Sequence, residues 1–365
     1  MCYDCDVEDE RTHDQPGLVI LFGSGETSAS GQKVFDWLLR RLPSPARVAI
    51  VETPAGFELN SAQVAGRIGE FLCHRLQNYQ PQVTVVPARK RGTPFSPDNP
   101  EIAALIPGAH AIFLGPGSPT YAVRQLQGSL TWQTAVACHM LGAALILASA
   151  ATVAIGTHTL PVYEIYKVGE ELHWRDGLDL FRPYGLSLAL IPHWNNSDGG
   201  VDLDTSRCWM GRSRFEQLSA MLPPGVTVIG IDEHTAVVLD LAAGSCQVMG
   251  RGGASVLRGG KERRVEHGHS LPLSEWGPFH EPPGGTELPP EVRELVHRAQ
   301  APVPSKMALD PPPEVVLLAQ EREAARVRLD WATADALRGQ IAALGWQVLD
   351  TQAGPQLQWA KSGVK

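Results

Sequence analysis

The sequence predicts an α/β protein: a doubly wound, mostly parallel sheet followed by a small helical hairpin module. Short apolar runs alternate with amphipathic stretches through the first part of the chain, a pattern typical of strands joined by crossover helices. These runs are apolar throughout, which indicates a sheet covered by helices on both faces. Helical periodicity resumes near the C-terminal end, after a stretch rich in proline and glycine.

Four parts are expected along the 365 residues. Residues 1–15 are acidic and polar and predict a disordered leader. Residues 16–258 carry the alternation of strands and helices and form the α/β domain. Residues 259–313 predict a proline- and glycine-rich linker, and residues 314–360 predict the helical module.

The α/β domain opens with apolar runs that predict strands, separated by stretches with apolar residues at helical spacing. Ligands of such sheets lie beyond the carboxyl ends of the strands, so the residues that follow each strand are functional candidates. The predicted strands are 17–22, 47–51, 83–87 and 110–114, and the helices between them are 31–42 and 60–78.

Composition and charge argue against several classes of function. A formal net charge of −8 argues against a broad footprint on nucleic acid or on an anionic membrane. The six cysteines are scattered apart from one C-x-x-C pair, which favours a reducing compartment, and no secretory leader opens the sequence, so we expect a cytoplasmic protein. The apolar segment 135–156 is rich in alanine and divided by Gly142, which predicts a buried crossover instead of a membrane span.

Residues 144–156, ALILASAATVAIG, predict a strand, a tight turn of small residues and a helix start. Such a turn can lift a serine nucleophile out of a sheet and aim the next backbone N–H at an oxyanion. Ser149 is therefore the candidate nucleophile and Ala150 a candidate oxyanion donor. The alternative is a buried serine that donates to a backbone carbonyl.

A serine nucleophile needs a base within hydrogen-bond reach. His193 follows the predicted strand 186–191, which Pro192 ends, 44 residues after the serine. This position at the same edge of the sheet makes His193 the candidate general base. The alternative is a histidine that only packs beside its neighbouring tryptophan.

The turn LGPGSPTY at residues 114–121 lies between the strand 110–114 and a helix. Backbone N–H groups of Gly117 and Ser118 can complete an oxyanion site with Ala150. An ordinary helix-capping turn is the alternative for this segment.

The stretch after His193 is polar and contains candidates for substrate binding. Asn195, Asn196 and Arg207 are expected to contact a polar substrate, since a guanidinium can hold a carboxylate by two parallel bonds. The alternative is a surface network in which Asp204 or Thr205 caps the next helix. We expect Asp232 and Glu233, which follow the strand 227–231, either to have a structural role or to support a residue that contacts the substrate.

No cofactor and no metal is predicted. The turn FGSGETS at residues 22–28, with Glu52 after the second strand, is a partial dinucleotide fingerprint that lacks its third glycine. Asp202 and Asp204 alone do not make a calcium loop. The C-x-x-C pair at residues 2–5 lacks a second half at the spacing of a zinc site.

Residues 17–258 resemble the cyanophycinase and aspartyl dipeptidase family of serine peptidases. The resemblance rests on the turn 115–121, the strand–serine–helix segment, the P-H-W sequence at His193, the arginines before Phe215, VIGIDEHTAVVLD and VMGRGGASVL. It implies a class I glutamine amidotransferase-like, flavodoxin-like fold and hydrolysis of a peptide bond next to aspartate.

The same resemblance implies Ser149 as nucleophile, His193 as base and an acid from the segment between them. Glu164 lies at a distance from the serine similar to that of the family's acid, with Glu170 and Asp176 as alternatives. A glutamine amidotransferase is disfavoured, because that chemistry uses a cysteine at the position of Ser149.

Two positions depart from the family's pattern. Leu147 replaces a small residue two positions before the serine, and Ala151 replaces a glycine two positions after it. A bulky leucine is expected to crowd the strained turn, so that the turn is shifted or not formed. The alternative function is therefore a catalytically inactive binding protein.

The last fifty residues resemble a second family. Helices are predicted at 314–329 and 330–344, followed by a hairpin. The string REAARVRLDWATADALRGQIAALGWQVLDT resembles the C-terminal anticodon-end module of cysteinyl-tRNA synthetase, which implies a contact with tRNA through residues 314–360. The nucleotide-binding motifs of a synthetase, H-I-G-H and K-M-S-K-S, are absent from the sequence.

Residues 314–365 contain six basic and six acidic side chains, a weak footprint for tight phosphate binding. The alternative is a module kept for packing or oligomerisation. The expected partners are therefore a small peptide substrate, tRNA through the C-terminal module and a second copy of the chain, and no membrane.

Overall fold

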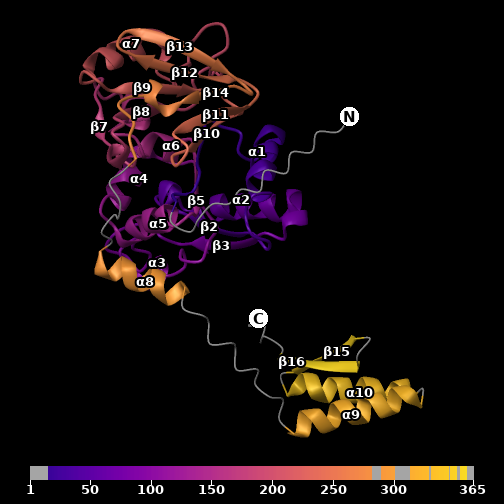
Figure 1. Cartoon of the computed structure of the whole chain (residues 1–365). Helices are drawn as coiled ribbons and strands as arrows, with labels where there is room; N and C mark the ends of the chain where they lie inside the picture. The colour runs from indigo at the N-terminus through magenta and orange to yellow at the C-terminus, as the bar shows by residue number, and fades with distance from the viewer. Residues whose placement is uncertain are drawn as a thin grey trace, which may run out of the picture. The chain divides into compact units, whose positions relative to one another are not determined.

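The computed structural model describes residues 15–281, 289–300, 313–328, 330–344, 346–351 and 354–359. The chain divides into two compact units, residues 1–300 and 301–365, which Figure 1 shows with their helices and strands labelled. The predicted leader up to residue 14, both cysteines of the C-x-x-C pair and part of the predicted linker lie outside the described residues.

The first unit contains an eight-stranded sheet in the order β14-β11-β10-β1-β5-β4-β2-β3. The strands β1, β5, β4, β2 and β3 run parallel to one another. On the other side of β1, the sheet continues through the antiparallel pairs β1–β10, β10–β11 and β11–β14. The strands are β1 Val19–Phe22, β2 Arg47–Val51, β3 Gln82–Val86, β4 Ala111–Leu114, β5 Ala144–Ala148, β10 Thr235–Asp240, β11 Ser245–Gly250 and β14 Ser270–Pro272.

A second sheet has six strands in the order β13-β12-β9-β8-β6-β7. In it β6, β8 and β9 are parallel and the remaining pairs are antiparallel. Its strands are β6 His158–Thr159, β7 Arg175–Asp176, β8 Leu188–Ile191, β9 Thr227–Ile231, β12 Gly253–Arg258 and β13 Lys261–Glu266.

The predicted α/β class is confirmed, but the strands form two mixed sheets instead of one mostly parallel sheet. The helix that follows β5 has only five residues, whereas a return to the same parallel sheet needs a crossover of about a dozen residues or more. The chain therefore leaves the first sheet after β5 and starts the second sheet at β6.

Helices cover both faces of the first sheet, as its apolar strands predict. Ile20 and Phe22 of β1 belong to a core cluster with α1 and α2, whereas Leu21 belongs to a cluster with α4, α5 and α6. The helices of the first unit are α1 Ala29–Leu39, α2 Ser61–Arg75, α3 Pro100–Ala103, α4 Pro119–Leu126, α5 Leu130–Met140, α6 Ala150–Ala154, α7 Gly211–Met221 and α8 Pro290–Gln300.

The predicted linker is wrong for residues 259–281. β13 pairs with β12 and β14 pairs with β11, so this segment completes both sheets. Gly259 and Gly260 have φ of 57° and 74° and form the two-residue hairpin turn that favours glycine. The charges of KERRVE suggested a linker, but they belong to an edge strand that exposes five of its six residues.

The second unit contains two helices and a hairpin, as predicted. The elements are α9 Pro313–Val327, α10 Trp331–Ala343, β15 Trp346–Thr351 and β16 Gly354–Trp359. Val315 and Ala319 of α9, Ile341 of α10, and Trp346 and Val348 of β15 form its buried core. Across the described part of both units, no helix has the length and apolar character needed to cross a membrane.

Candidate active site

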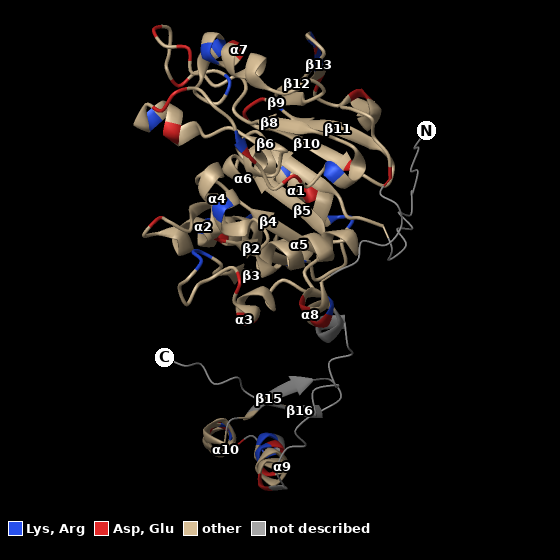
Figure 2. Ribbon diagram, turned by 90° about the vertical axis from the view of Figure 1, so that its left-hand side faces the viewer, with Lys and Arg blue, Asp and Glu red and all other residues tan. Residues whose placement is uncertain are grey.

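The candidate residues gather where parallel strands end. β5 lies between β1 and β4 in the first sheet, so Ser149 follows the same edge as the turns that begin at Gly23 and Gly115. The strands β8 and β9 of the second sheet end at Ile191 and Ile231, just before His193 and Glu233. Figure 2 shows α4 and α6, which start at this edge, next to each other.

The turn that carries Ser149 is strained. Ser149 has φ 52° and ψ −109°, and its N–H donates to the carbonyl oxygen of Phe22 at 3.3 Å. Thr152 Oγ1 lies within hydrogen-bond distance of the carbonyl oxygens of both Phe22 and Leu147. A buried hydroxyl thus ties the first turn of α6 to β1 and β5 and offsets the cost of this backbone conformation.

The expectation that Leu147 would disrupt this turn is wrong. Leu147 is fully buried in β5 and pairs in register with Leu21 and Leu114. Its side chain therefore packs in the core between sheet and helices, and the serine turn forms with leucine at this position. Ala151 is buried in the first turn of α6.

Ser149 and His193 meet as predicted. Ser149 Oγ lies 2.9 Å from His193 Nε2. His193 itself has φ 52°, and its N–H donates to the carbonyl oxygen of Gly23 at 3.2 Å. The base is thus fixed to the loop that follows β1, next to the strand that carries the serine.

The carboxylate that contacts the imidazole is Glu233, for which the sequence predicts only a structural role or support of a residue that contacts the substrate. Glu233 Oε1 lies 3.0 Å from His193 Nδ1 and accepts a hydrogen bond of 3.0 Å from Asn196 Nδ2. The Glu233 N–H donates to Asn195 Oδ1 at 2.8 Å. Asn196 therefore holds the carboxylate on the imidazole, and Asn195 holds the backbone of Glu233.

Glu164, the acid that the sequence predicted, does not make this contact. Its Oε1 accepts a hydrogen bond of 2.5 Å from Thr120 Oγ1, at the start of α4. The alternatives are also elsewhere, because Glu170 pairs with His173 and Arg175, and Asp176 is an exposed residue of β7. Nδ1 of the imidazole contacts Glu233, which follows β9, the parallel neighbour of β8.

Two of the three predicted oxyanion donors remain available. In the described residues, the N–H groups of Gly117 and Ala150 donate to no protein acceptor, and Gly117 has φ 150° with its α-carbon against the Pro54 carbonyl. The N–H of Ser118 donates to Pro54 O at 2.9 Å, so the prediction for this group is wrong. Ser118 Oγ accepts from Tyr121 N and caps α4.

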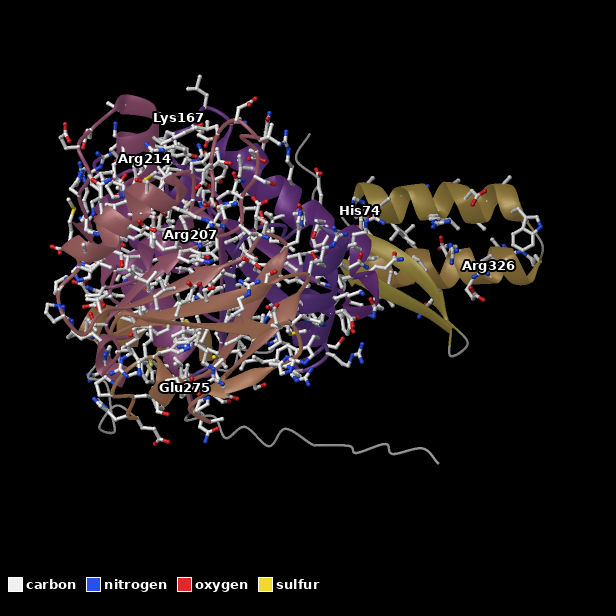
Figure 3. All side chains as sticks on the ribbon, turned by 90° about the horizontal axis from the view of Figure 1, so that it is seen from above. His74, Lys167, Arg207, Arg214, Glu275 and Arg326 are labelled. Atoms are coloured by element: carbon white, nitrogen blue, oxygen red, sulfur yellow. The ribbon has the colours of Figure 1, made fainter. Side chains whose placement is uncertain are left out.

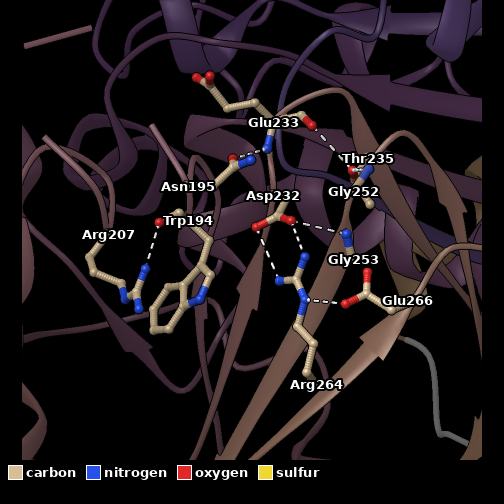
Figure 4. Close-up of polar contacts among 10 residues, drawn as sticks. All are labelled: Trp194, Asn195, Arg207, Asp232, Glu233, Thr235, Gly252, Gly253, Arg264 and Glu266. Atoms are coloured by element: carbon tan, nitrogen blue, oxygen red, sulfur yellow. Dashed lines mark hydrogen bonds and ion pairs between the residues drawn. The ribbon is translucent and has the colours of Figure 1, made fainter. Parts of the chain in front are cut away.

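Arg207 and Asn195 support the chain itself. The Arg207 guanidinium lies 3.7 Å from the centre of the Trp194 ring and donates to Trp194 O at 2.9 Å, as Figure 4 shows beside the contact of Asn195 with Glu233. Trp194 packs on Gly230, where a Cβ would lie 2.2 Å from the indole. That Arg207 also contacts substrate stays a prediction.

Asp232 has a structural role, as expected. It forms an ion pair with Arg264 of β13 and accepts a hydrogen bond of 3.0 Å from the N–H of Gly253. These contacts join the β9–β10 turn to β12 and β13. They hold the backbone from which the neighbouring Glu233 reaches His193.

Charge at the site depends on burial and hydrogen bonding. The hydrogen bond from His193 lowers the pKa of Glu233, so this carboxylate stays ionised at neutral pH. Burial raises the pKa of Glu26, in the loop after β1, although His193 and His234 act in the opposite direction. Burial also raises the pKa of the Cys208 thiol to about 12, so a thiolate nucleophile is not available there.

The acidic residues that suggested a dinucleotide or a calcium site form hydrogen bonds and ion pairs within the protein. Glu52 is buried against Arg89 and Ser61, which leaves its carboxylate engaged within the fold. Asp204 accepts from the N–H groups of Ser206 and Arg212, and its pKa is lowered to about 2 chiefly by hydrogen bonds. No group of three or more potential ligands surrounds a metal position within the described ranges.

A hollow of about 470 Å³ adjoins the site on the side of the loop after β8. Its lining includes Asn195, Asn196, Arg207 and Arg212, together with Val201 and Leu203 of the loop. The hollow therefore shares two asparagines with the contacts that hold Glu233, and it offers both polar and apolar surface.

No family model matches the sequence. A crystal structure of a peptidase from an acI-B1 Actinobacterium is similar, with a TM-score of 0.58 and 22% sequence identity, and the match covers 72% of this chain and 98% of that chain. This likeness shows the fold of the first unit, in agreement with the α/β fold that the sequence predicts.

The C-terminal region is similar to two curated cysteine–tRNA ligases. It is 45% identical over 56 residues to the ligase of Chlamydia abortus and 48% identical over 58 residues to that of Opitutus terrae. The matches cover 15% and 16% of this chain but only 12% and 13% of the two ligases. The chain thus spans about an eighth of these relatives.

Proposed function

We propose that the first unit is a serine hydrolase of the peptidase kind, with Ser149 as nucleophile, His193 as general base and Glu233 as the orienting acid. One observation carries this proposal: the continuous contact from Ser149 Oγ to His193 Nε2 at 2.9 Å and from His193 Nδ1 to Glu233 Oε1 at 3.0 Å. A nucleophile, a base and a carboxylate in this order are the arrangement of a serine triad.

In the first half of the reaction, Ser149 Oγ attacks the carbonyl carbon of the peptide bond while His193 Nε2 takes its proton. The carboxylate of Glu233 accepts from Nδ1–H and stabilises the imidazolium that forms. The N–H groups of Gly117 and Ala150 stabilise the negative oxygen of the tetrahedral intermediate.

The intermediate collapses when the bond from carbon to nitrogen breaks, and His193 gives its proton to the leaving amine. An acyl group then remains on Ser149 Oγ. A water molecule attacks this ester with His193 again as the base, and release of the acid returns Ser149 to its hydroxyl form.

The substrate is a peptide or an isopeptide. Cleavage next to aspartate follows from the family resemblance, and the hollow beside Asn195 and Arg207 is where its side chain would bind. A guanidinium at this position suits a carboxylate.

The test is covalent labelling with a fluorophosphonate probe, measured by intact mass. The wild-type protein should gain one adduct, and Ser149→Ala should gain none while keeping the same melting temperature. Ser213→Ala is the matched control, because Ser213 is exposed on α7 and should leave the adduct unchanged. A folded wild type that does not label would reject the hydrolase and favour the inactive binding protein.

We also propose, for the second unit, that residues 314–360 contact tRNA. The observation in favour is the similarity of the C-terminal region to cysteine–tRNA ligases. With six basic and six acidic side chains in residues 314–365, we expect weak binding that falls steeply with salt. A gel shift with tRNA at low salt, lost on deletion of residues 314–365, tests this, and no shift at low salt rejects it.

A further inference from the structure

Three consecutive residues beside the candidate triad have an unusual backbone. Arg207, Cys208 and Trp209 have φ of 58°, 59° and 64°, in the left-handed range that residues with a side chain rarely adopt, and almost never in succession. Gly211 follows with φ 71°. Such a run persists only where its surroundings fix it.

Backbone hydrogen bonds tie this segment to the peptide that carries the base. Cys208 N–H donates to His193 O at 3.2 Å, and Arg207 N–H donates to Trp194 O at 3.0 Å. Gly211 N–H closes the turn on the carbonyl oxygen of Ser206 at 2.8 Å.

Two arginines hold the segment from either end. Arg207 donates to Trp194 O and stacks on the Trp194 ring. Arg214 donates to the carbonyl oxygens of Trp209 at 2.9 Å and Met210 at 2.7 Å. Figure 3 labels both arginines on the first unit.

The consequence of this backbone is the position of the Trp209 ring. Its centre lies 4.7 Å from the centre of the His193 imidazole, with the two planes at 54°. The imidazole has one hydrogen bond at each nitrogen, to Ser149 and to Glu233. The indole packs beside the imidazole, at a position where it limits movements of the ring that would lengthen these two bonds.

We propose that Trp209 is a positioning residue for His193, placed by the left-handed segment 207–209 so that the imidazole keeps both hydrogen bonds. This inference rests on the proposed function of the site. A core residue of ordinary kind would need no strained backbone, and Trp209 is only partly buried.

The kinetic test compares Trp209→Leu, which keeps apolar bulk, with Trp209→Phe, which keeps an aromatic ring. Trp209→Leu should slow fluorophosphonate labelling about tenfold, since misplacement of a reacting group by less than 1 Å has effects of this order. Trp209→Phe should restore the rate to within about threefold of the wild type. In peptide hydrolysis the loss should appear in kcat with KM little changed.

Trp174→Leu is the matched control. Trp174 is a partly buried tryptophan of the same unit whose Nε1 donates to Leu218 O, and its loss should leave the labelling rate unchanged. Equal labelling by Trp209→Leu and wild type, or an equal loss in Trp174→Leu, would overturn the proposal. Thermal melting of each variant separates a loss of fold from a loss of position.

A second measurement does not depend on activity. A proton shared by His193 Nδ1 and Glu233 should give a resonance at low field in the proton NMR spectrum, identified by its loss in His193→Gln. We expect this resonance in the wild type, in Trp209→Phe and in Trp174→Leu, and its broadening beyond detection in Trp209→Leu. Its persistence in Trp209→Leu, or its absence from the wild type, would overturn the proposal even if the protein hydrolyses no substrate.

Discussion

The two units of this chain are understood through different kinds of information. The first unit has only 22% identity to the peptidase of the same fold, yet its loops bring a serine, a histidine and a glutamate into contact in that order. The second unit has 45–48% identity to short segments of cysteine–tRNA ligases. In this unit Arg326 forms an ion pair with Glu323, one turn earlier on the same helix.

This difference shows which kind of evidence supports an inference about chemistry: the geometry of a site or the similarity of a sequence. A triad is a set of distances, so low identity over most of the chain does not weaken the argument from geometry. A small module with a core of Val315, Ala319 and Ile341 can keep its sequence for packing as well as for a partner. Substitutions in the first unit should therefore change catalysis, whereas substitutions in the second unit should change tRNA binding.

The largest effect is expected from the carboxylate on the imidazole. Glu233→Gln keeps the shape but removes the charge that stabilises the imidazolium, and we expect a loss of about 10³- to 10⁴-fold in kcat/KM. Glu164→Gln changes a residue bonded to Thr120 and should cost less than about tenfold. Initial rates on a peptide substrate measure both, and a larger loss in Glu164→Gln would return that residue to the role predicted from sequence.

A smaller effect is expected from the turn that follows β4. Gly117 has φ 150°, and a Cβ there would lie 1.9 Å from the Pro54 carbonyl oxygen. Gly117→Ala must therefore move the turn, and the loss of one oxyanion donor should lower kcat about 10²-fold. Gly128→Ala is the control with a positive φ but no neighbour within 4 Å. Comparable kcat values for the two variants would contradict the assigned donor.

Much of the fold and part of the site follow from local sequence. Apolar runs predict β2 and β9 at their observed bounds, because four or five consecutive buried residues distinguish each strand from the segments around it. Ser149 and His193 are predicted to lie close together because each follows such a strand, and their side chains are in contact. The resemblance placed the acid between them in sequence, and that restriction excluded Glu233.

The missing information was the order of strands. β8 and β9 are neighbours, with Ile191 opposite Gly230, so the residues after them meet although 40 positions separate His193 from Glu233. The pairing of β13 with β12 was hidden for a related reason, since charged residues fit the exposed face of an edge strand as well as they fit a linker.

Acid sensitivity should also distinguish the units. His139 is fully buried in α5, and burial lowers its pKa to about 4. Because the unfolded chain takes up this proton near pH 6.5 and the folded chain does not, the histidine costs stability as pH falls from 6.5 to 4, by about 3 kcal/mol in total.

His139→Gln should flatten the fall in unfolding free energy of the first unit over this pH range, as followed by urea titration. Residues 301–365 contain no histidine, so no buried histidine can give the second unit a pH dependence of this kind. An unchanged pH slope in His139→Gln would show that the histidine is protonated in the folded state.

The smallest effect on chemistry is expected from the second unit. Ala334 is buried in α10, and Ala334→Pro should break that helix, because proline removes a backbone donor and clashes with the preceding turn. If the triad belongs wholly to the first unit, the variant should label with the fluorophosphonate within about twofold of the wild-type rate, and only tRNA binding should weaken. Asp335→Ala, an exposed change on the same helix, should weaken neither. A large fall in labelling in Ala334→Pro would mean that the second unit contributes to the reactivity of Ser149. The two units would then not be functionally separate.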